Sequence, residues 1–260
     1  MALFALLKPT SQLTRIPEVD AYHLILTSQV LKDEVYRSHY ARLIAMGHHV
    51  ILDNDAWELG AAIGLDEMLG AVELIQQRTN KSFEVVLPDE IGNATATIAR
   101  SVAARIELQQ QGVESVMVIP QGTTVEEWLE CAQSLLQLDP QCIAIPGHFG
   151  DEVPGGVAYL LGTLGQLTNL PIHFLGLSRD IKQIAKLAQY PQVRGIDTCK
   201  PVSWAVGGYI VSQRDLLVAW NLLPRRPPNF FELPEAAVYP NMVLENVQMI
   251  REVFTNGFSE

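Results

Sequence analysis

The sequence predicts an α/β fold, a single (β/α)8 barrel of the TIM type over residues 1–260. Three observations predict it. Short β-branched runs alternate with segments of helical spacing, the length is close to the roughly 250 residues of one such barrel, and no glycine-rich nucleotide-binding fingerprint follows any run. Strands that alternate with helices form right-handed crossovers and a parallel sheet. An open doubly wound sheet is the alternative fold.

Seven runs have the composition of buried strands. They are residues 21–27, 49–53, 83–87, 115–119, 142–145, 171–177 and 193–197. An eighth strand, which would complete the barrel, is expected near 209–211.

Helical spacing is clearest in four segments, with a further helix expected at the C-terminal end of the chain. These segments are 65–78, 94–111, 124–137 and 179–189, and the terminal helix is at about 240–254. The helix at 94–111 carries an apolar stripe typical of a helix that covers a sheet, formed by Ile98, Val102, Ile106 and Leu108. Before the terminal helix, segment 222–240 is rich in proline and is expected to be a long surface loop.

The composition is typical of a globular protein and disfavours a general binder of polyanions. Hydrophobic residues make up 48% of the chain, which is enough for a sizeable core. The formal charge of -11 disfavours non-specific attraction to a polyanion, so a nucleic-acid role must depend on local basic patches. The candidate patches are Arg194 with Lys200, and the run 214–226.

No apolar run reaches the ~18 residues that a membrane span needs, and the N-terminus has no charged leader, so a cytoplasmic protein without a membrane partner is expected. The three cysteines are widely separated and form neither a disulfide framework nor a CxxC pair. No structural zinc is therefore expected. The cysteines are Cys131, Cys142 and Cys199.

Three predicted strands end in a carboxylate, at Asp53, Asp89 and Asp197, and Gln121 and Gly147 follow two others. A single aspartate at such a place is more often a helix cap or a turn residue. In a barrel, however, the carboxyl ends of all strands meet at one face, where active sites are built. Two carboxylates there can cleave a glycosidic bond, one as nucleophile and one as acid and base.

Six motifs in order resemble those of the tRNA-guanine transglycosylases and of their smaller relatives that insert 7-deazaguanines into DNA. The motifs are DNDAW at 53–57, LPDE at 87–90, PQG at 120–122, AIPGHFGDE at 144–152, HFLGL at 173–177 and GIDTCKP at 195–201. The resemblance covers about residues 49–205. The order and spacing of the motifs are more specific than any one of them.

By this resemblance Asp197 is the nucleophile and Asp53 is the general acid and base. The residues implied to bind the base are Asp89, Gln121, Gly122, Gly147, Trp57, Asn54 and Glu152. In that set the aromatic ring stacks on the base, the aspartate and the glutamine read its hydrogen-bonding edge, and the glycine-bearing turn supplies backbone contacts. No metal ligand and no cofactor is implied.

The implied activity is that of a pentosyltransferase. Guanine, flipped out of the strand, leaves as a covalent aspartyl-glycosyl intermediate forms, and a free 7-deazaguanine of the preQ0 type takes its place. DNA is favoured over tRNA because the chain lacks the cysteine-rich zinc cluster of the tRNA enzymes. The chain also departs from those enzymes at 54–56, where they carry Ser-Gly-Gly, and at 202–203, where they carry Thr-Arg.

Three alternatives stay open: a tRNA-guanine transglycosylase, a catalytically silent paralogue that acts as a partner subunit, and an unrelated barrel aldolase or isomerase. The aldolases often use a lysine at a strand end, and no lysine is expected there, because Lys200 lies in the loop beyond a strand. The sequence leaves a homodimer and a helper protein open as partners.

Overall fold

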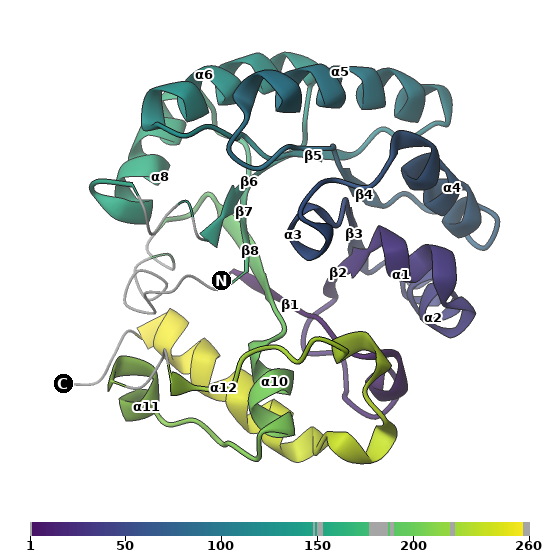
Figure 1. The fold of residues 1–260 in the computed structure, drawn as a ribbon, viewed down its shortest axis with the longest axis vertical. Helices are drawn as coiled ribbons and strands as arrows, with labels where there is room; N and C mark the ends of the chain where they lie inside the picture. The colour runs from purple at the N-terminus through teal and green to yellow at the C-terminus, as the bar shows by residue number, and fades with distance from the viewer. Residues whose placement is uncertain are drawn as a thin grey trace. The chain divides into compact units, whose positions relative to one another are not determined.

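The computed structural model describes residues 2–147, 149, 153–176, 187, 190–218 and 222–256. The fold is a (β/α)8 barrel, as predicted, with eight strands in one sheet in the order β1-β8-β7-β6-β5-β4-β3-β2 and parallel pairing between neighbours (Figure 1). The strands are β1 (Leu3–Leu6), β2 (Tyr22–Leu26), β3 (His49–Asp53), β4 (Glu84–Val86), β5 (Val116–Val118), β6 (Cys142–Pro146), β7 (Ile172–Leu175) and β8 (Val193–Thr198).

Helices and short 3-10 turns alternate with the strands. The helices are α1 (Thr27–Lys32), α2 (Glu34–Ala45), α3 (Ala56–Leu59), α4 (Leu65–Gln76), α5 (Ala94–Gln110), α6 (Val125–Leu135), α8 (Gly156–Leu167), α10 (Lys200–Val206), α11 (Gln213–Val218) and α12 (Pro240–Asn256). The 3-10 turns are η1 (Thr10–Gln12), η2 (Leu136–Leu138), η4 (Phe230–Glu232) and η5 (Glu235–Ala237). The predictions near α4, α5, α6 and α12 are confirmed, and the helix expected at 179–189 lies outside the described residues.

The chain divides into two compact units, each described here by itself. The first unit comprises Met1–Asp20, Pro146–Asn169 and Phe174–Glu260, and the second comprises Ala21–Ile145 and Leu170–His173. Strands β2 to β5 belong to the second unit, and β1 pairs with β8 in the first. Within the described ranges, no helix combines the length and the apolar character needed to cross a membrane.

The eighth strand is β1, and the prediction of a strand at 209–211 is wrong. Residues 3–6 pair with β8 over the register Leu3↔Gly195 to Leu6↔Thr198. At 209–211 the β-forming residues Tyr-Ile-Val are instead bound by one buried side chain: Asn246 Oδ1 accepts from the Val211 amide at 2.9 Å, and Asn246 Nδ2 donates to the Tyr209 carbonyl at 3.0 Å. A backbone satisfied in this way has no need of a neighbouring strand.

The buried face of α5 also differs from the prediction. Val102 and Ile106 are 40% and 53% exposed. The buried residues are the small or polar Thr97, Ser101 and Ala104, together with Leu108 of the predicted stripe. Thr97 and Ser101 donate hydrogen bonds to loop carbonyls after β4, which lets the helix lie close to the strand ends. Val102 and Ile106 of the predicted stripe therefore lie on the outside, whereas Leu108 is buried as predicted.

The proline-rich segment 222–240 is not simply a surface loop. Its 3-10 turn η4 buries Phe230 at 1% exposure, and Leu233 and Val238 of the same segment are buried as well. Ser11 Oγ donates to the Leu233 carbonyl at 2.7 Å, so the segment is also bound to η1 near the start of the chain. It forms neither an α-helix nor a strand, as expected.

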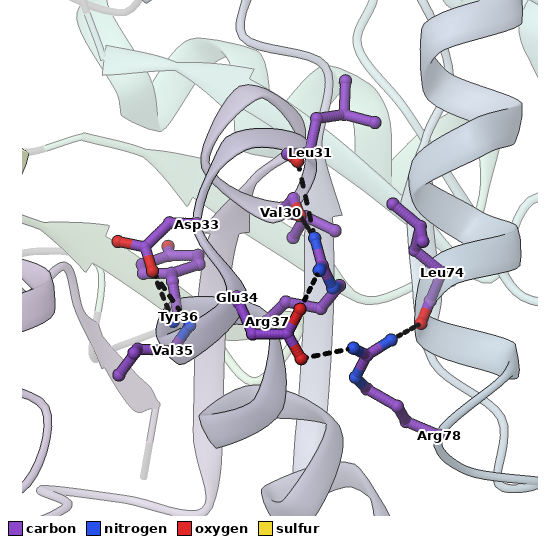
Figure 2. A network of polar contacts seen from close by, with 9 residues as sticks. All are labelled: Val30, Leu31, Asp33, Glu34, Val35, Tyr36, Arg37, Leu74 and Arg78. Atoms are coloured by element: carbon purple, nitrogen blue, oxygen red, sulfur yellow. Dashed lines mark hydrogen bonds and ion pairs between the residues drawn. The ribbon is translucent and has the colours of Figure 1, made fainter.

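A polar network joins α1, α2 and α4 in the second unit (Figure 2). The buried Arg37 donates to the Val30 carbonyl at 2.6 Å and to the Leu31 carbonyl at 3.4 Å, in the last turn of α1, where carbonyls have no partner within the helix. Arg37 also pairs with Glu34 at 2.7 Å, and Glu34 pairs with Arg78 on the other side at 2.7 Å. Arg37, which lies in α2, therefore caps the C-terminal end of α1.

Replacing Arg37 by alanine is expected to lower the free energy of unfolding by about 1–3 kcal/mol, because the carbonyls at the end of α1 lose a buried, charge-assisted donor. Urea titration measures the change. Arg78→Ala is the matched control, since the Glu34–Arg78 pair is largely exposed to solvent and should contribute little. Equal effects of the two variants would contradict this account of the network.

Candidate active site

Four polar side chains gather where β3, β4 and β5 end in the second unit. Asp53 is the last residue of β3 and Asn54 follows it, while Asp89 and Gln121 lie three residues beyond β4 and β5. All four are buried, with exposures between 1% and 8%. Parallel pairing of β3 with β4 and of β4 with β5 brings these ends to one edge of the sheet.

Two amides hold the carboxylate of Asp89. Asn54 Nδ2 donates to Asp89 Oδ1 at 2.7 Å, and Gln121 Nε2 donates to Asp89 Oδ2 at 2.6 Å. Asn54 Nδ2 also donates to the Leu87 carbonyl at 2.9 Å, and Gln121 Oε1 accepts from the Gly92 amide at 3.1 Å. These further bonds fix how each amide is oriented. We call Asn54, Asp89 and Gln121 the Asp89 cluster.

Burial raises the pKa of Asp89, and the hydrogen bonds from Asn54 and Gln121 act in the opposite direction. A carboxylate in such a place is a strong acceptor because little solvent competes for it. Its two oxygens offer about four acceptor positions, so two amide donors do not exhaust them. The Asp89 cluster can therefore accept further N–H groups from a ligand.

A second group of acids lies beside this cluster. One carboxylate oxygen from each of Asp53, Asp55 and Glu58 lies within 4.8 Å of the others. Thr27 Oγ1 donates to the Asp53 carbonyl at 2.6 Å, and the Asp55 amide donates to Asp53 Oδ2 at 3.2 Å. Among the described residues this is the one such group with metal-ligand spacing. Acids gather in this way in many proteins without an ion, so the group by itself does not identify a metal centre.

Asp55 is the functional candidate that the sequence did not single out. Its backbone is left-handed at φ 60°, and its buried carboxylate accepts from the Ser28 amide at 2.6 Å and from Ser28 Oγ at 3.2 Å. Burial raises its pKa from 3.8 to about 6, and the neighbouring charge of Glu58 adds to the shift. Aspartate and asparagine tolerate this left-handed turn conformation better than most residues. Their occurrence at 54 and 55, directly after a predicted strand, was the available signal in the sequence.

Replacing Asp55 by asparagine is expected to change how stability depends on pH. Because the pKa of Asp55 is higher in the folded protein than its unfolded value, the folded state holds the proton more tightly. The proton on Asp55 therefore stabilises the folded state fully below about pH 4, and this stabilisation is lost as the pH rises towards 6. The variant should therefore gain roughly 2–3 kcal/mol of unfolding free energy relative to wild type between pH 4 and pH 7.

Urea unfolding at a series of pH values measures this difference, in which the contributions of all other titrating groups cancel. Asp66→Asn, at an exposed position in the first turn of α4, is the control and should show a constant difference. A constant difference for Asp55→Asn as well would contradict the prediction.

Two further predicted residues of the second unit have clear places. Trp57 lies on the short helix α3 and is 62% exposed, so its ring is accessible to a ligand. Gly122 is needed for packing: a Cβ there would lie 2.6 Å from the Trp128 amide in α6. This close approach of the helix fixes the backbone that carries Gln121.

In the first unit, Asp197 lies in β8, opposite Ala5 of β1, and is 8% exposed. Its Oδ1 accepts from the Gly176 amide at 3.0 Å. Gly176 follows β7 with φ +72°, a conformation that favours glycine. Gly147, directly after β6, is buried, and Glu152 lies outside the described residues. Asp197 is thus a buried carboxylate oriented by a backbone amide.

Within the second unit the structure joins Asn54, Asp89 and Gln121 by hydrogen bonds, and Asp53 precedes Asn54 at the end of β3. Asp197 and Gly147 belong to the first unit. The meeting of Asp53 with Asp197 around one ligand therefore stays a prediction.

Sequence reasoning also missed Lys8, which lies two residues beyond the end of β1, although none of the described strands ends in a lysine, as expected. Burial lowers the pKa of Lys8, and Glu18 opposes that effect. Lys8 Nζ donates to Glu18 Oε1 at 2.8 Å and to the Ile16 carbonyl at 3.1 Å. With 1% exposure, the ammonium group ties down the loop after η1 and is closed to a substrate carbonyl.

No family model and no curated protein matches the chain. Among solved structures, an N-acetylneuraminate lyase from Mycoplasma synoviae is similar at 9% identity and a TM-score of 0.50, over 76% of this chain and 68% of that one. An N-acetylneuraminate lyase from Fusobacterium nucleatum is similar at 11% identity and a TM-score of 0.46, over 98% and 84% of the two chains. At 9% identity the likeness to the Mycoplasma synoviae lyase shows the fold alone.

Proposed function

We propose that the protein is a guanine transglycosylase, which exchanges a guanine in nucleic acid, DNA ahead of tRNA, for a 7-deazaguanine of the preQ0 type. The observation that supports it best is the Asp89 cluster: a buried carboxylate whose two oxygens are each held by an amide, one of them from Asn54, the residue after Asp53. The motif resemblance assigns base reading to Asp89 and Gln121 independently of these contacts.

The Asp89 cluster suits guanine because the Watson–Crick edge of guanine presents two adjacent N–H donors. A buried carboxylate accepts both strongly, and a base that lacks them leaves the charge unpaired, which makes such a site selective. A 7-deazaguanine has the same edge, so the leaving and the incoming base fit one site. Trp57, exposed on α3, supplies a face for stacking.

The chemistry would proceed in two displacements. A carboxylate oxygen of Asp197 attacks C1′ of the nucleoside, the glycosidic bond to guanine breaks, and Asp53 gives its proton to the departing base. Asp53 then takes a proton from the 7-deazaguanine, whose nitrogen attacks C1′ and releases Asp197. The Gly176 amide holds Asp197 Oδ1 in a fixed direction throughout.

The test uses DNA and, separately, tRNA that contain labelled guanine, each incubated with the protein and preQ0. We expect release of label from DNA that depends on added preQ0. Release from tRNA alone would support the tRNA enzyme instead. Absence of release from both polymers would overturn the proposal and favour the silent partner subunit.

A further inference from the structure

The turn after β3 is bound to the start of α1 by two neighbouring residues. The register Leu26↔Asp53 sets the ends of β2 and β3 side by side, so α1 begins next to this turn (Figure 1). Thr27 Oγ1 donates to the Asp53 carbonyl at 2.6 Å. The Ser28 amide donates to Asp55 Oδ2 at 2.6 Å, and Ser28 Oγ donates to Asp55 Oδ1 at 3.2 Å. Both carboxylate oxygens of Asp55 are therefore bound by one residue of α1.

The backbone conformation of Asp55 is rare in this chain. Among the described residues, only Asp55 and Asp139 combine a side chain with a positive φ, at 60° and 54°. This left-handed region disfavours most side chains, although aspartate tolerates it better than most. Asp139 is exposed, at the end of the 3-10 turn η2, whereas Asp55 is buried at 0% exposure. The hydrogen bonds to Ser28 hold the left-handed conformation of Asp55 inside the fold.

This conformation directs the backbone amide of Asp55 at the side chain of Asp53. The amide donates to Asp53 Oδ2 at 3.2 Å and so holds the rotation of that carboxyl group. An oxygen that accepts an N–H bond is the carbonyl-like one when the group is protonated, which places the proton on Asp53 Oδ1. The next residue makes the same kind of bond, since Asn54 Oδ1 accepts from the Ala56 amide at 2.9 Å. The backbone of the turn thus orients two side chains of the candidate site.

The carboxylate of Asp55 is closed to a substrate at 0% exposure, so an effect on the reaction must pass through the residues that it holds. We propose that Asp55 is a positioning residue for Asp53: its anchor on α1 holds the turn, and its amide orients the carboxyl group that gives and takes the proton. The inference rests on the proposed function, in which Asp53 is the general acid and base. The hydrogen bonds of the anchor are measurable without any exchange of guanine.

Two substitutions separate the anchor from the charge of Asp55. Asp55→Gly keeps the left-handed backbone, which glycine adopts without strain, and removes both bonds to Ser28. Asp55→Asn tolerates the same backbone, keeps an oxygen that accepts from the Ser28 amide and removes the charge. The kcat of guanine exchange should fall roughly 10- to 100-fold in the glycine variant and less than about threefold in the asparagine variant. The KM for preQ0 should stay within about twofold in both, because Asp89 and Gln121 are unchanged.

Amide hydrogen exchange at residues 28 and 55, followed by NMR, measures the anchor directly. Both amides should be protected in wild type and in Asp55→Asn, and both should exchange at least about tenfold faster in Asp55→Gly after correction for sequence. The matched control is Asp139→Gly, the same substitution at the other left-handed aspartate, which should exchange guanine like wild type. If the glycine variant does not fold, the asparagine variant still decides. A loss of more than tenfold in its kcat would show that the charge acts on Asp53 and would overturn the proposal.

The positioning role and the proposed function fail in different ways. A wild type that releases no labelled guanine refutes the transglycosylase, and amide exchange still tests the anchor in that protein. Unchanged protection of both amides in Asp55→Gly refutes the anchor without reference to any reaction. A protein that exchanges guanine, and whose Asp55→Gly variant keeps the kcat of wild type or changes KM alone, refutes the positioning role and leaves the transglycosylase standing.

Discussion

Asp197→Asn is expected to lower the rate of guanine exchange by at least about 10³-fold and to abolish the covalent adduct with nucleic acid. An amide cannot form the ester bond to C1′ on which both displacements depend, and removal of a nucleophile is among the largest single effects in enzymes. The fold should survive, because the asparagine oxygen can still accept from the Gly176 amide. Label release and a denaturing gel of protein with labelled DNA measure the two effects.

The control is Asp66→Asn, which makes the same chemical change at an exposed position on α4 and should exchange guanine like wild type. Asp53→Ala should also release no label, since the departing base then lacks its acid. An adduct that persists in Asp197→Asn would remove this residue from the chemistry, and exchange within twofold of wild type would do the same.

The fold was predictable where periodic pattern and tertiary structure agree. The run HVILD is a strand that pairs on both edges, and its end at Asp53 could be placed to the residue. The run LFAL, which became β1, is four residues long without a β-branched side chain, so it carries little local signal. Its pairing with β8, nearly 200 residues away, makes it a strand.

The opposite error occurred at 209–211, where strong β-forming residues form no strand because Asn246 binds their backbone from a distant helix. Intrinsic preference is a weak guide wherever one buried polar side chain satisfies a backbone segment. A related reason applies to α5, whose inner face carries the hydrogen-bonding Thr97 and Ser101 beside the predicted Leu108.

The residues of the candidate site could be named from the sequence, but the contacts among them could not. Asp89 and Gln121 were named from motif order, yet their hydrogen bond joins residues 32 positions apart in sequence and depends on the registers of β3, β4 and β5. The contact made by Asn54 was not predictable from the motifs either. It stands where the tRNA enzymes that the motifs resemble carry a serine, and its amide is one of the two donors to Asp89.

Asp89→Asn is the second change with a large expected effect, a loss of at least about 10²-fold in kcat/KM for exchange. In the variant, an N–H₂ group takes the place of one accepting oxygen. This donor would face the N–H donors of guanine and the amide donor of either Asn54 or Gln121, so hydrogen bonds are lost on both sides. Because the leaving and incoming bases share this edge, the affinity for free preQ0 should fall as well, which calorimetry measures directly.

A double-mutant cycle separates base reading from a general loss of structure. Gln121→Ala removes one of the two amides, and if both residues act through the Asp89 cluster, the double variant should lose less than the product of the single losses. The free energies of unfolding of the same variants are expected to be coupled too, because Asp89 and Gln121 share a hydrogen bond, so the calorimetric affinity for free preQ0 is the measurement that a purely structural role would leave unchanged. Additive losses in kcat/KM, or an Asp89→Asn variant that binds preQ0 like wild type, would mean that the carboxylate shapes the loop after β4 and does not read the base.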